Sequence, residues 1–389
     1  MKQLVVKTIF ITVLLSLYCC SKDTVSEDTV PDDLVVQEWN GRIKPGAYCY
    51  SGWSGKCGYD DGKPENAWAK GMPTEISKLL TTTYSGREPI WGWRDDSQEI
   101  MEQQIDLAAD NGIAFFSFCW YAKNANGKLD IPLILSYSYN LETHLFMKAK
   151  NNSKMEFCLL LVNDFNTSSM IVGTDLCKQV ADFCIKTYFK HPRYLKVGGK
   201  PVFMIWSPGK TEKEGLDYLQ EASKKAGYPG VFVVGLKTCT AENGFHGQTL
   251  YNFKPYYYNN KQLNLTDLYP FKYLADRNIS VWNSINLPDM PYIPCLTSGW
   301  DRSPWEPPFP DGRGVTVETH FARGTPAEFE QYMESMADWI EANPEKTTKE
   351  RLAMIYAWNE IGEGGWLVPC KDDPEGAYLK AIRKVVFGK

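Results

Sequence analysis

The chain has 389 residues, 43% of them hydrophobic and 14% aromatic, which is enough for one large α/β domain or two ordinary ones. Its formal net charge of −5 gives no excess of basic side chains, which argues against nucleic acid as the main partner. The four histidines are scattered and no Cys-x-x-Cys or His-Glu-x-x-His spacing occurs, so the sequence supports no metal site, and it implies no cofactor.

The N-terminal segment has the features of a bacterial lipoprotein signal. Lys2 and Lys7 precede an apolar stretch, residues 9–17, that is too short to span a bilayer. Cys19 and Cys20 follow shortly after this stretch, and we expect Cys20 to be the lipidated residue. We therefore predict a signal peptide at 1–20, a flexible tether at 21–39 and a catalytic domain at 40–389. The protein is expected to lie outside the cytoplasm, anchored to a membrane by its lipid.

Most of the other cysteines have no clear disulfide pattern. Cys119, Cys158 and Cys295 lie inside apolar runs and are expected to be small buried hydrophobes. Cys49 and Cys57 are close enough in sequence for a bridge in an oxidising compartment, which the sequence leaves open.

Apolar runs that resemble buried strands recur along the whole chain. Several are apolar throughout rather than alternating, as in strands that are covered on both faces of a parallel sheet. The eight runs are residues 43–50, 113–119, 156–162, 201–206, 231–236, 249–253, 292–296 and 352–358.

Helical patterns separate these runs. We expect Asp96 and Glu99 to form a capping box, with Gly112 ending that helix. Thr325 opens a second helix with a regular apolar stripe, and Asp373 opens the last one. Eight strands with intervening helices, and no glycine-rich phosphate loop after the first, favour a single (β/α)8 barrel over a doubly wound sheet.

The active site of such a barrel lies at the carboxyl ends of the strands. The side chains there are rich in aromatics and carboxylates, with few basic groups and no histidine, as expected for a sugar cleft. Asp164 and Lys237 also follow strands. The residues that we expect to bind a polysaccharide or oligosaccharide substrate are Tyr50, Trp53, Asp95, Trp120, Tyr121, Asn163, Trp206, Tyr256, Trp300, Asp301 and Asn359.

The most informative stretch follows the last strand. Residues 358–365 read Trp-Asn-Glu-Ile-Gly-Glu-Gly-Gly, which sets Glu360 and Glu363 three residues apart on a glycine-rich turn. Glycines allow a tight bend and the close approach of a ligand. Two carboxylates beside one pocket are the minimal equipment for splitting a glycosidic bond. A glutamate after a strand can also be a solvated loop charge or a helix cap, but the pair beside a buried Trp-Asn favours catalysis.

The segment Trp358-Asn359-Glu360-x-x-Glu363-Gly364 resembles the Asn-Glu-Trp-x-Glu-Gly signature of the glycoside hydrolase family 99-like proteins. That group includes the family 99 endo-α-mannosidases and the WbsX-like proteins, which are often labelled as glycosyltransferases. Residues 92–95, 115–121 and 294–301 resemble the same group, and the similarity extends over about residues 43–387.

The resemblance implies a (β/α)8 barrel and a retaining, endo-acting hydrolase of α-mannosides. It implies that Glu360 acts as a base on the substrate 2-hydroxyl, giving a 1,2-anhydro sugar, and that Glu363 acts as general acid and then as base. Ile361 stands where the signature usually has Trp. Residues 163–166 lack both the longer Trp- and Arg-rich loop of WbsX-like relatives and the His-containing motif of endo-mannosidases. The reaction class is therefore better defined than the substrate.

Two alternatives remain. A glycosyltransferase would need a sugar nucleotide and a phosphate-binding feature, and the export signal argues against it. A non-catalytic glycan-binding lipoprotein would explain the aromatic side chains, but not the presence of both glutamates.

Overall fold

The computed structural model describes residues 39–163, 168–306 and 318–388, and the part from Trp39 onward forms one compact unit. The predicted signal peptide, the lipidation site Cys20, almost all of the predicted tether and Asp164 lie outside the described residues. No helix in the described ranges combines the length and the apolar character needed to cross a membrane.

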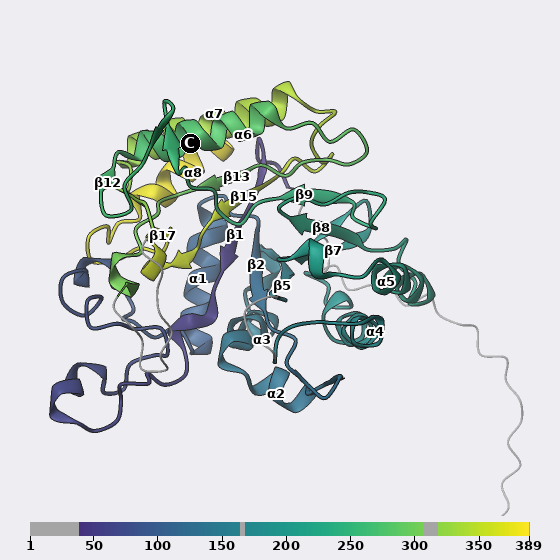
Figure 1. Cartoon of the computed structure of the whole chain (residues 1–389), viewed down its shortest axis with the longest axis horizontal. Helices are drawn as coiled ribbons and strands as arrows, with labels where there is room; N and C mark the ends of the chain where they lie inside the picture. The colour runs from purple at the N-terminus through teal and green to yellow at the C-terminus, as the bar shows by residue number, and fades with distance from the viewer. Residues whose placement is uncertain (1–38, 164–167, 307–317, 389) are drawn as a thin grey trace, which may run out of the picture. The chain divides into compact units, whose positions relative to one another are not determined.

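Eight parallel strands form a nearly closed barrel (Figure 1), in the order β13-β15-β1-β2-β5-β7-β8-β9. A parallel bridge between Gln248 and Tyr292 brings β9 beside the segment that leads into β13, and the amide of Ile293 donates to the carbonyl of Gln248 at 2.8 Å. The predicted (β/α)8 barrel is confirmed. Its strands are β1 (Lys44–Cys49), β2 (Phe115–Trp120), β5 (Glu156–Leu161), β7 (Lys200–Ile205), β8 (Phe232–Leu236), β9 (Gly247–Thr249), β13 (Cys295–Thr297) and β15 (Leu352–Tyr356).

Helices connect successive barrel strands and lie around them in Figure 1, except between β8 and β9, where residues 237–246 make the connection without one. The helices are α1 (Gln98–Asp110), α2 (Ile131–Ser136), α3 (Leu141–Lys148), α4 (Thr174–Cys184), α5 (Lys213–Lys225), α6 (Phe271–Ser284), α7 (Pro326–Ala342) and α8 (Ala377–Phe387).

Strands of two residues each add short β-ladders to the barrel. All but β6 lie in segments that follow the carboxyl ends of barrel strands, so they help to shape the rim where the site is expected. They are β3 (Asn124–Ala125) with β4 (Lys128–Leu129), β6 (Lys196–Val197) with β7, β10 (Tyr257–Tyr258) with β11 (Lys261–Gln262), β12 (Leu268–Tyr269) with β14 (His320–Phe321), and β16 (Asn359–Glu360) with β17 (Gly365–Trp366).

The helix ends match the predictions in part. Thr325 caps α7 in a capping box, and α1 ends before Gly112. The predicted cap of α1 is wrong, because Asp96 pairs with Arg94 and the neighbouring Ser97 hydroxyl accepts from the first turn instead. Helix α8 begins four residues after Asp373, whose carboxylate accepts from the Ala377 amide at 2.8 Å.

The boundary of the sixth strand matters for the site. The predicted strand at 249–253 is in fact β9 at Gly247–Thr249, so Tyr251 lies beyond the strand end. The apolar run continues because the ring of Tyr251 packs between those of Tyr48 and Tyr356, not because the backbone stays paired.

Candidate active site

Glu360 and Glu363 lie on one tight hairpin directly after β15. Glu360 ends β16, residues 361–363 form a 3₁₀ turn, and Gly364 returns the chain into β17 with φ +85°. A Cβ atom on Gly364 would lie 2.3 Å from the amide nitrogen of Asp301, so this turn requires glycine. The glycine here accommodates the neighbouring backbone rather than a ligand, and in doing so fixes both glutamates relative to the barrel.

Glu360 is buried beneath the site, with 5% of its surface exposed. The hydroxyl of Tyr251 donates to its Oε1, while Oε2 has no hydrogen-bond partner among the described residues. Burial raises the pKa of Glu360 well above its usual value, the charge of Glu363 adds to the rise, and the Tyr251 hydroxyl opposes it. Glu360 therefore binds a proton more readily than an ordinary glutamate side chain.

Glu363 has different surroundings. The hydroxyl of Tyr356 donates to its Oε2 at 2.5 Å, and the Nε atom of Arg302 lies 3.4 Å from its Oε1. Its side chain is 18% exposed. The rings of Tyr251 and Tyr356 pack edge to face, with 5.0 Å between their centres. Each of these two contacting tyrosines therefore donates a hydrogen bond to one carboxyl of the pair. The site thus contains a buried carboxyl with a raised pKa beside a more exposed carboxyl that faces a cation.

A network of charges supports Glu363 from the β13 side. The amide of Asp301 donates to the carbonyl of Glu363 at 2.8 Å, and its carboxylate pairs with Arg87 and lies 3.2 Å from Nδ1 of His320. Burial alone would raise the pKa of Asp301, but the His320 hydrogen bond and the Arg87 charge outweigh it and hold the pKa well below the usual range. Burial lowers the pKa of Arg87, which still leaves this guanidinium charged.

Further basic groups lie on the same side. Lys254 pairs with Glu318 and lies 3.7 Å from the centre of the Trp300 ring, and Arg302 lies 3.7 Å from Glu318. The predicted scarcity of basic groups and absence of histidine are therefore wrong, since Arg87, Arg302 and His320 lie within 4 Å of the carboxylates of Asp301 or Glu363. Trp300 itself is 2% exposed, so it contributes little surface of its own.

A cluster of tyrosines lies beyond the ends of β1 and β2. Tyr50, Tyr121, Tyr137 and Tyr139 are all half-buried, and their rings contact one another at 5.2–5.8 Å between centres. The hydroxyl of Tyr139 donates to buried Glu75. Glu360 contributes to the raised pKa of Tyr50, after burial, Glu75 and the neighbouring tyrosines, so the cluster is close to the carboxyl pair.

Trp206 and Tyr256 are also partly accessible. The half-buried ring of Trp206 packs edge to face on Tyr251 at 4.6 Å, and Nζ of Lys237 lies 5.5 Å from its centre. Tyr256 is 51% exposed. The chain just before it is fixed to the charged network, because the Thr319 hydroxyl donates to the Pro255 carbonyl at 3.4 Å.

Three predicted ligand-binding side chains do not face the cleft. Trp120 is fully buried against Phe183, and its indole donates to Tyr188, so it packs between the barrel and its helices. Trp53 is 1% exposed and belongs to the core. Asn163 uses its amide to join the end of β5 to the Ser207 backbone, through bonds of 2.9 and 3.1 Å.

Asp95 and Asn359 are also wrong as direct ligands, because they are 3% and 2% exposed. Asn359 accepts from the Tyr50 amide at 2.7 Å, and its own amide group faces Asp95 and Glu142. Both residues form a layer beneath Glu360 rather than the surface of the site.

The sequence analysis did not identify several residues that lie near Glu360 and Glu363. Tyr251 would have been found with the correct end of β9, since it follows that strand by two residues. Arg302 adjoins the predicted Asp301, which is a weak signal. The sequence contains no signal for Tyr356, Glu75 or Glu142, because each lies inside a helix or strand or far along the chain from the motif.

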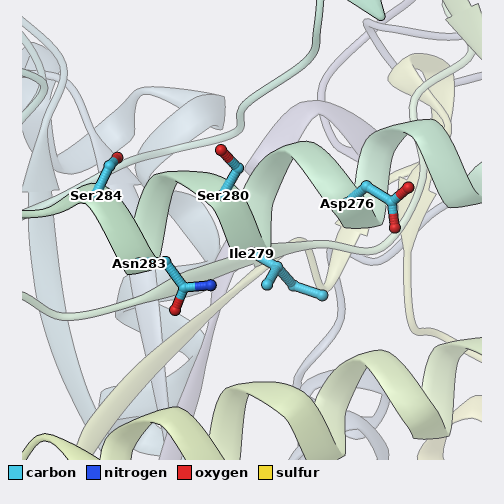
Figure 2. Close-up of a pocket in the computed structure, with 5 residues that line it drawn as sticks. All are labelled: Asp276, Ile279, Ser280, Asn283 and Ser284. Atoms are coloured by element: carbon cyan, nitrogen blue, oxygen red, sulfur yellow. The ribbon is translucent and has the colours of Figure 1, made fainter. Parts of the chain in front are cut away.

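A separate hollow lies along the outer face of α6, lined by side chains of that single helix (Figure 2). Its one carboxylate, Asp276, already bonds to Tyr258 at 2.6 Å and pairs with Lys272 at 2.7 Å. This hollow has no pair of catalytic groups and lies outside the barrel rim.

Comparisons with known proteins give a fold and a family. The family 99 endo-α-mannosidase of Bacteroides thetaiotaomicron is 15% identical, with a TM-score of 0.54 over 88% of this chain and 95% of that one. A structure described as a glycoside hydrolase-like protein is 13% identical, with a TM-score of 0.56 over 92% and 97% of the two chains. At this identity the likeness is one of fold.

No match was found among curated proteins. The model of the family described as glycosyltransferase WbsX matches residues 93–382, which is most of the barrel. The chain therefore belongs to the WbsX family, on a barrel shared with glycoside hydrolases of family 99.

Proposed function

We propose that this protein is a glycoside hydrolase that cleaves within an α-linked, mannan-like glycan, with retention of configuration, through Glu360 and Glu363. The observation that carries the proposal is the pair itself, two carboxyls on one hairpin in different surroundings, one buried with a raised pKa and one partly exposed beside Arg302. Glycosidic cleavage needs one carboxyl that can give a proton and one that is ionised. The endo mode and retention rest on the family resemblance.

The resemblance assigns the base to Glu360 and the acid to Glu363, whereas burial in the ligand-free protein raises the pKa of Glu360. We propose that substrate binding opposes this rise. A 2-hydroxyl hydrogen-bonded to Glu360 stabilises the ionised form of that carboxyl.

The sugar rings would lie on the aromatic surfaces on either side of the pair. The tyrosine cluster of Tyr50, Tyr121, Tyr137 and Tyr139 offers half-buried faces on the β1 and β2 side. Trp206 lies on the other side of Glu360, in contact with Tyr251. Exposed Tyr256 would extend this surface for a longer glycan.

The family description raises glycosyl transfer as a second possibility, which would need a cationic site for the diphosphate of a sugar nucleotide. Arg87, Arg302, Lys254 and His320 each lie within 4 Å of a carboxylate, so their charges are already neutralised. This arrangement supports hydrolysis. A glycan-binding protein without activity would not require two carboxyls on one hairpin in such different surroundings.

We also propose that the protein is held outside the cytoplasm by a lipid on Cys20. The support is the N-terminal sequence, a short apolar run between Lys7 and Cys20. Replacement Cys20→Ser should move the protein from the detergent phase to the aqueous phase when cells are extracted. Unchanged partition of the variant would refute the anchor.

An experiment with activated leaving groups tests the chemistry and the roles together. A glycosyl fluoride needs no proton from the acid, so Glu363→Gln should still release fluoride from an α-mannosyl oligosaccharide fluoride but should not cleave the natural glycan. Glu360→Gln should be inactive on both. The opposite pattern would exchange the two roles, and hydrolysis of both substrates by both variants would remove the pair from the mechanism.

A further inference from the structure

Two buried carboxyls meet behind the catalytic hairpin. Asp95 precedes α1 and Glu142 lies in α3, with 3% and 0% of their surfaces exposed. Their carboxyls are within hydrogen-bonding reach of each other. Both also contact the same group, because Nδ2 of Asn359 lies 3.4 Å from Oδ2 of Asp95 and 3.3 Å from Oε1 of Glu142.

No cation neutralises this pair within the described ranges. The Ser51 hydroxyl and the Cys49 thiol, both at the end of β1, donate to Oε2 of Glu142 at 3.0 and 3.2 Å. The nearby charged or titratable groups are Cys49, Asp96, which Arg94 already engages, Cys119 and the buried Glu360. None of these supplies a positive charge to Asp95 or Glu142.

Two adjacent negative charges are unfavourable at a buried site where no cation faces them. Burial raises the pKa of Asp95, with the charge of Glu142 adding to the rise, and burial raises the pKa of Glu142 as well. In addition, Oδ1 of Asp95 is buried and has no hydrogen-bond partner among the described residues. A proton between the two carboxyls would remove the repulsion and would give each a further hydrogen bond.

We propose that Asp95 and Glu142 share one proton and act together as positioning residues, holding the Asn359 amide and thereby the peptide that leads into Glu360. Proton sharing does not depend on the reaction. The effect on catalysis rests on the proposed glycosidase function.

The orientation of Asn359 supports this arrangement. Its Oδ1 accepts from the backbone amide of Tyr50 at 2.7 Å, so its NH₂ group must face the two acids. Its carbonyl accepts from the Trp53 indole at 2.8 Å. The two hydrogens of Nδ2 can each reach one carboxyl, and the shared proton then satisfies the contact between the acids. Three segments of the chain, around residues 50–53, 95 and 142, are thereby fixed to the residue that precedes Glu360.

Infrared spectroscopy tests the proton directly. The Glu360→Gln variant removes the other buried carboxyl with a raised pKa, so the proposal predicts one remaining protonated-carboxyl C=O band at neutral pH. Adding Asp95→Asn and Glu142→Gln should eliminate it, while Glu156→Gln, which removes a carboxylate paired with Lys44, should leave it unchanged. The proposal would be overturned if Glu360→Gln alone lacked this band, if the band had the intensity of two carboxyls, or if it remained after all three changes.

Should the triple variant not fold, unfolding of Glu360→Gln with and without Glu142→Gln gives the same answer. A folded state that binds one proton more than the unfolded state loses about tenfold in its folding constant per pH unit above the pKa of unfolded carboxyls. Replacing Glu142 should reduce that slope, because Asp95 then has no second carboxyl with which to share a proton. An identical slope in both proteins would contradict the shared proton.

Kinetics test the positioning role. Glu142→Gln can still accept from Asn359 and can donate to Asp95, so kcat should stay within about threefold of wild type. Glu142→Leu should lower kcat by about tenfold or more with little change in KM, because Glu360 is displaced while the sugar-binding surface is intact. Equal kcat for Gln and Leu would refute positioning. A wild type without activity on any glycan would refute the proposed function, and the infrared result would still decide the shared proton.

Discussion

The hydroxyl of Tyr251, two residues beyond β9, donates to the Oε1 atom of Glu360, which follows β15. Strands β9 and β15 are not neighbours in the barrel, since β13 lies between them. The contact therefore crosses the mouth of the barrel. It places the hairpin that carries Glu360 and Glu363 against the aromatic floor formed by Tyr48, Tyr251 and Tyr356.

Replacing Tyr251 by Phe should destabilise the protein, because Oε1 of Glu360 would be left buried without a donor. We expect the free energy of unfolding to fall by about 1–3 kcal/mol. Urea unfolding at neutral pH measures this change. Tyr218→Phe is the matched control, since Tyr218 also donates to a carboxylate, Asp182, but at the surface, and its effect should stay within about 0.5 kcal/mol. Equal losses in both variants would contradict the role of burial.

Replacing Glu360 by Gln should change how stability depends on pH. The pKa of Glu360 is raised by folding, so between the pKa of an unfolded Glu, about 4.3, and its folded value the native state holds a proton that the unfolded state has lost. Wild-type stability from this group is therefore full at acid pH and declines as pH rises. The free energy of unfolding of Glu360→Gln, minus that of wild type, should increase from about pH 4 to pH 8 in denaturant titrations. A constant difference would mean that Glu360 is not perturbed.

Asp301→Asn should have the opposite pH dependence. Folding lowers the pKa of Asp301, so its ionised form stabilises the native state above the pKa of an unfolded Asp, about 3.9, and this stability is lost as pH falls. The substitution leaves the buried Arg87 without its partner, and we expect a loss of about 3 kcal/mol at pH 7 that shrinks in acid. Thermal or urea unfolding at several pH values checks this, and a loss that grows in acid would refute the pairing.

Gly364→Ala should disturb the hairpin. The residue has φ +85°, and an added Cβ would lie 2.3 Å from the Asp301 amide, which donates to Glu363. Gly62 has a similar φ of +80° but open space around its Cβ position, so Gly62→Ala measures the backbone strain alone. Both variants should cost about 1 kcal/mol for strain, with a further loss in Gly364→Ala from the clash. Comparable losses would show that the hairpin tolerates the side chain.

The sequence predicts the barrel well, because continuous apolar strands and regular helical stripes are signals carried by neighbouring residues. The error at the sixth strand shows the limit of such signals. The run that contains Tyr251 is apolar since its ring fills the barrel mouth, and a pattern along the chain cannot distinguish that role from strand pairing.

The sequence points to Glu360 and Glu363 and to some of the aromatic residues around them, such as Tyr50, Tyr121 and Trp206, but not to the groups that support the pair. These supporting groups come from distant segments, as Glu142 of α3 and Arg302 after β13 show. Trp120 follows a strand as predicted, yet its ring is fully buried against Phe183. Which way a side chain points after a strand end depends on the local turn, and the sequence alone does not fix it.

The central claim is that the pair at Glu360 and Glu363 hydrolyses an α-linked glycan. The most direct measurement is product release from a panel of yeast and bacterial α-mannans and other α-glycans, followed by carbohydrate chromatography, with Glu363→Gln alongside. We expect oligosaccharides from the wild type and none from the variant. Products from both proteins, or none from the wild type on any glycan while it still binds them, would contradict the claim.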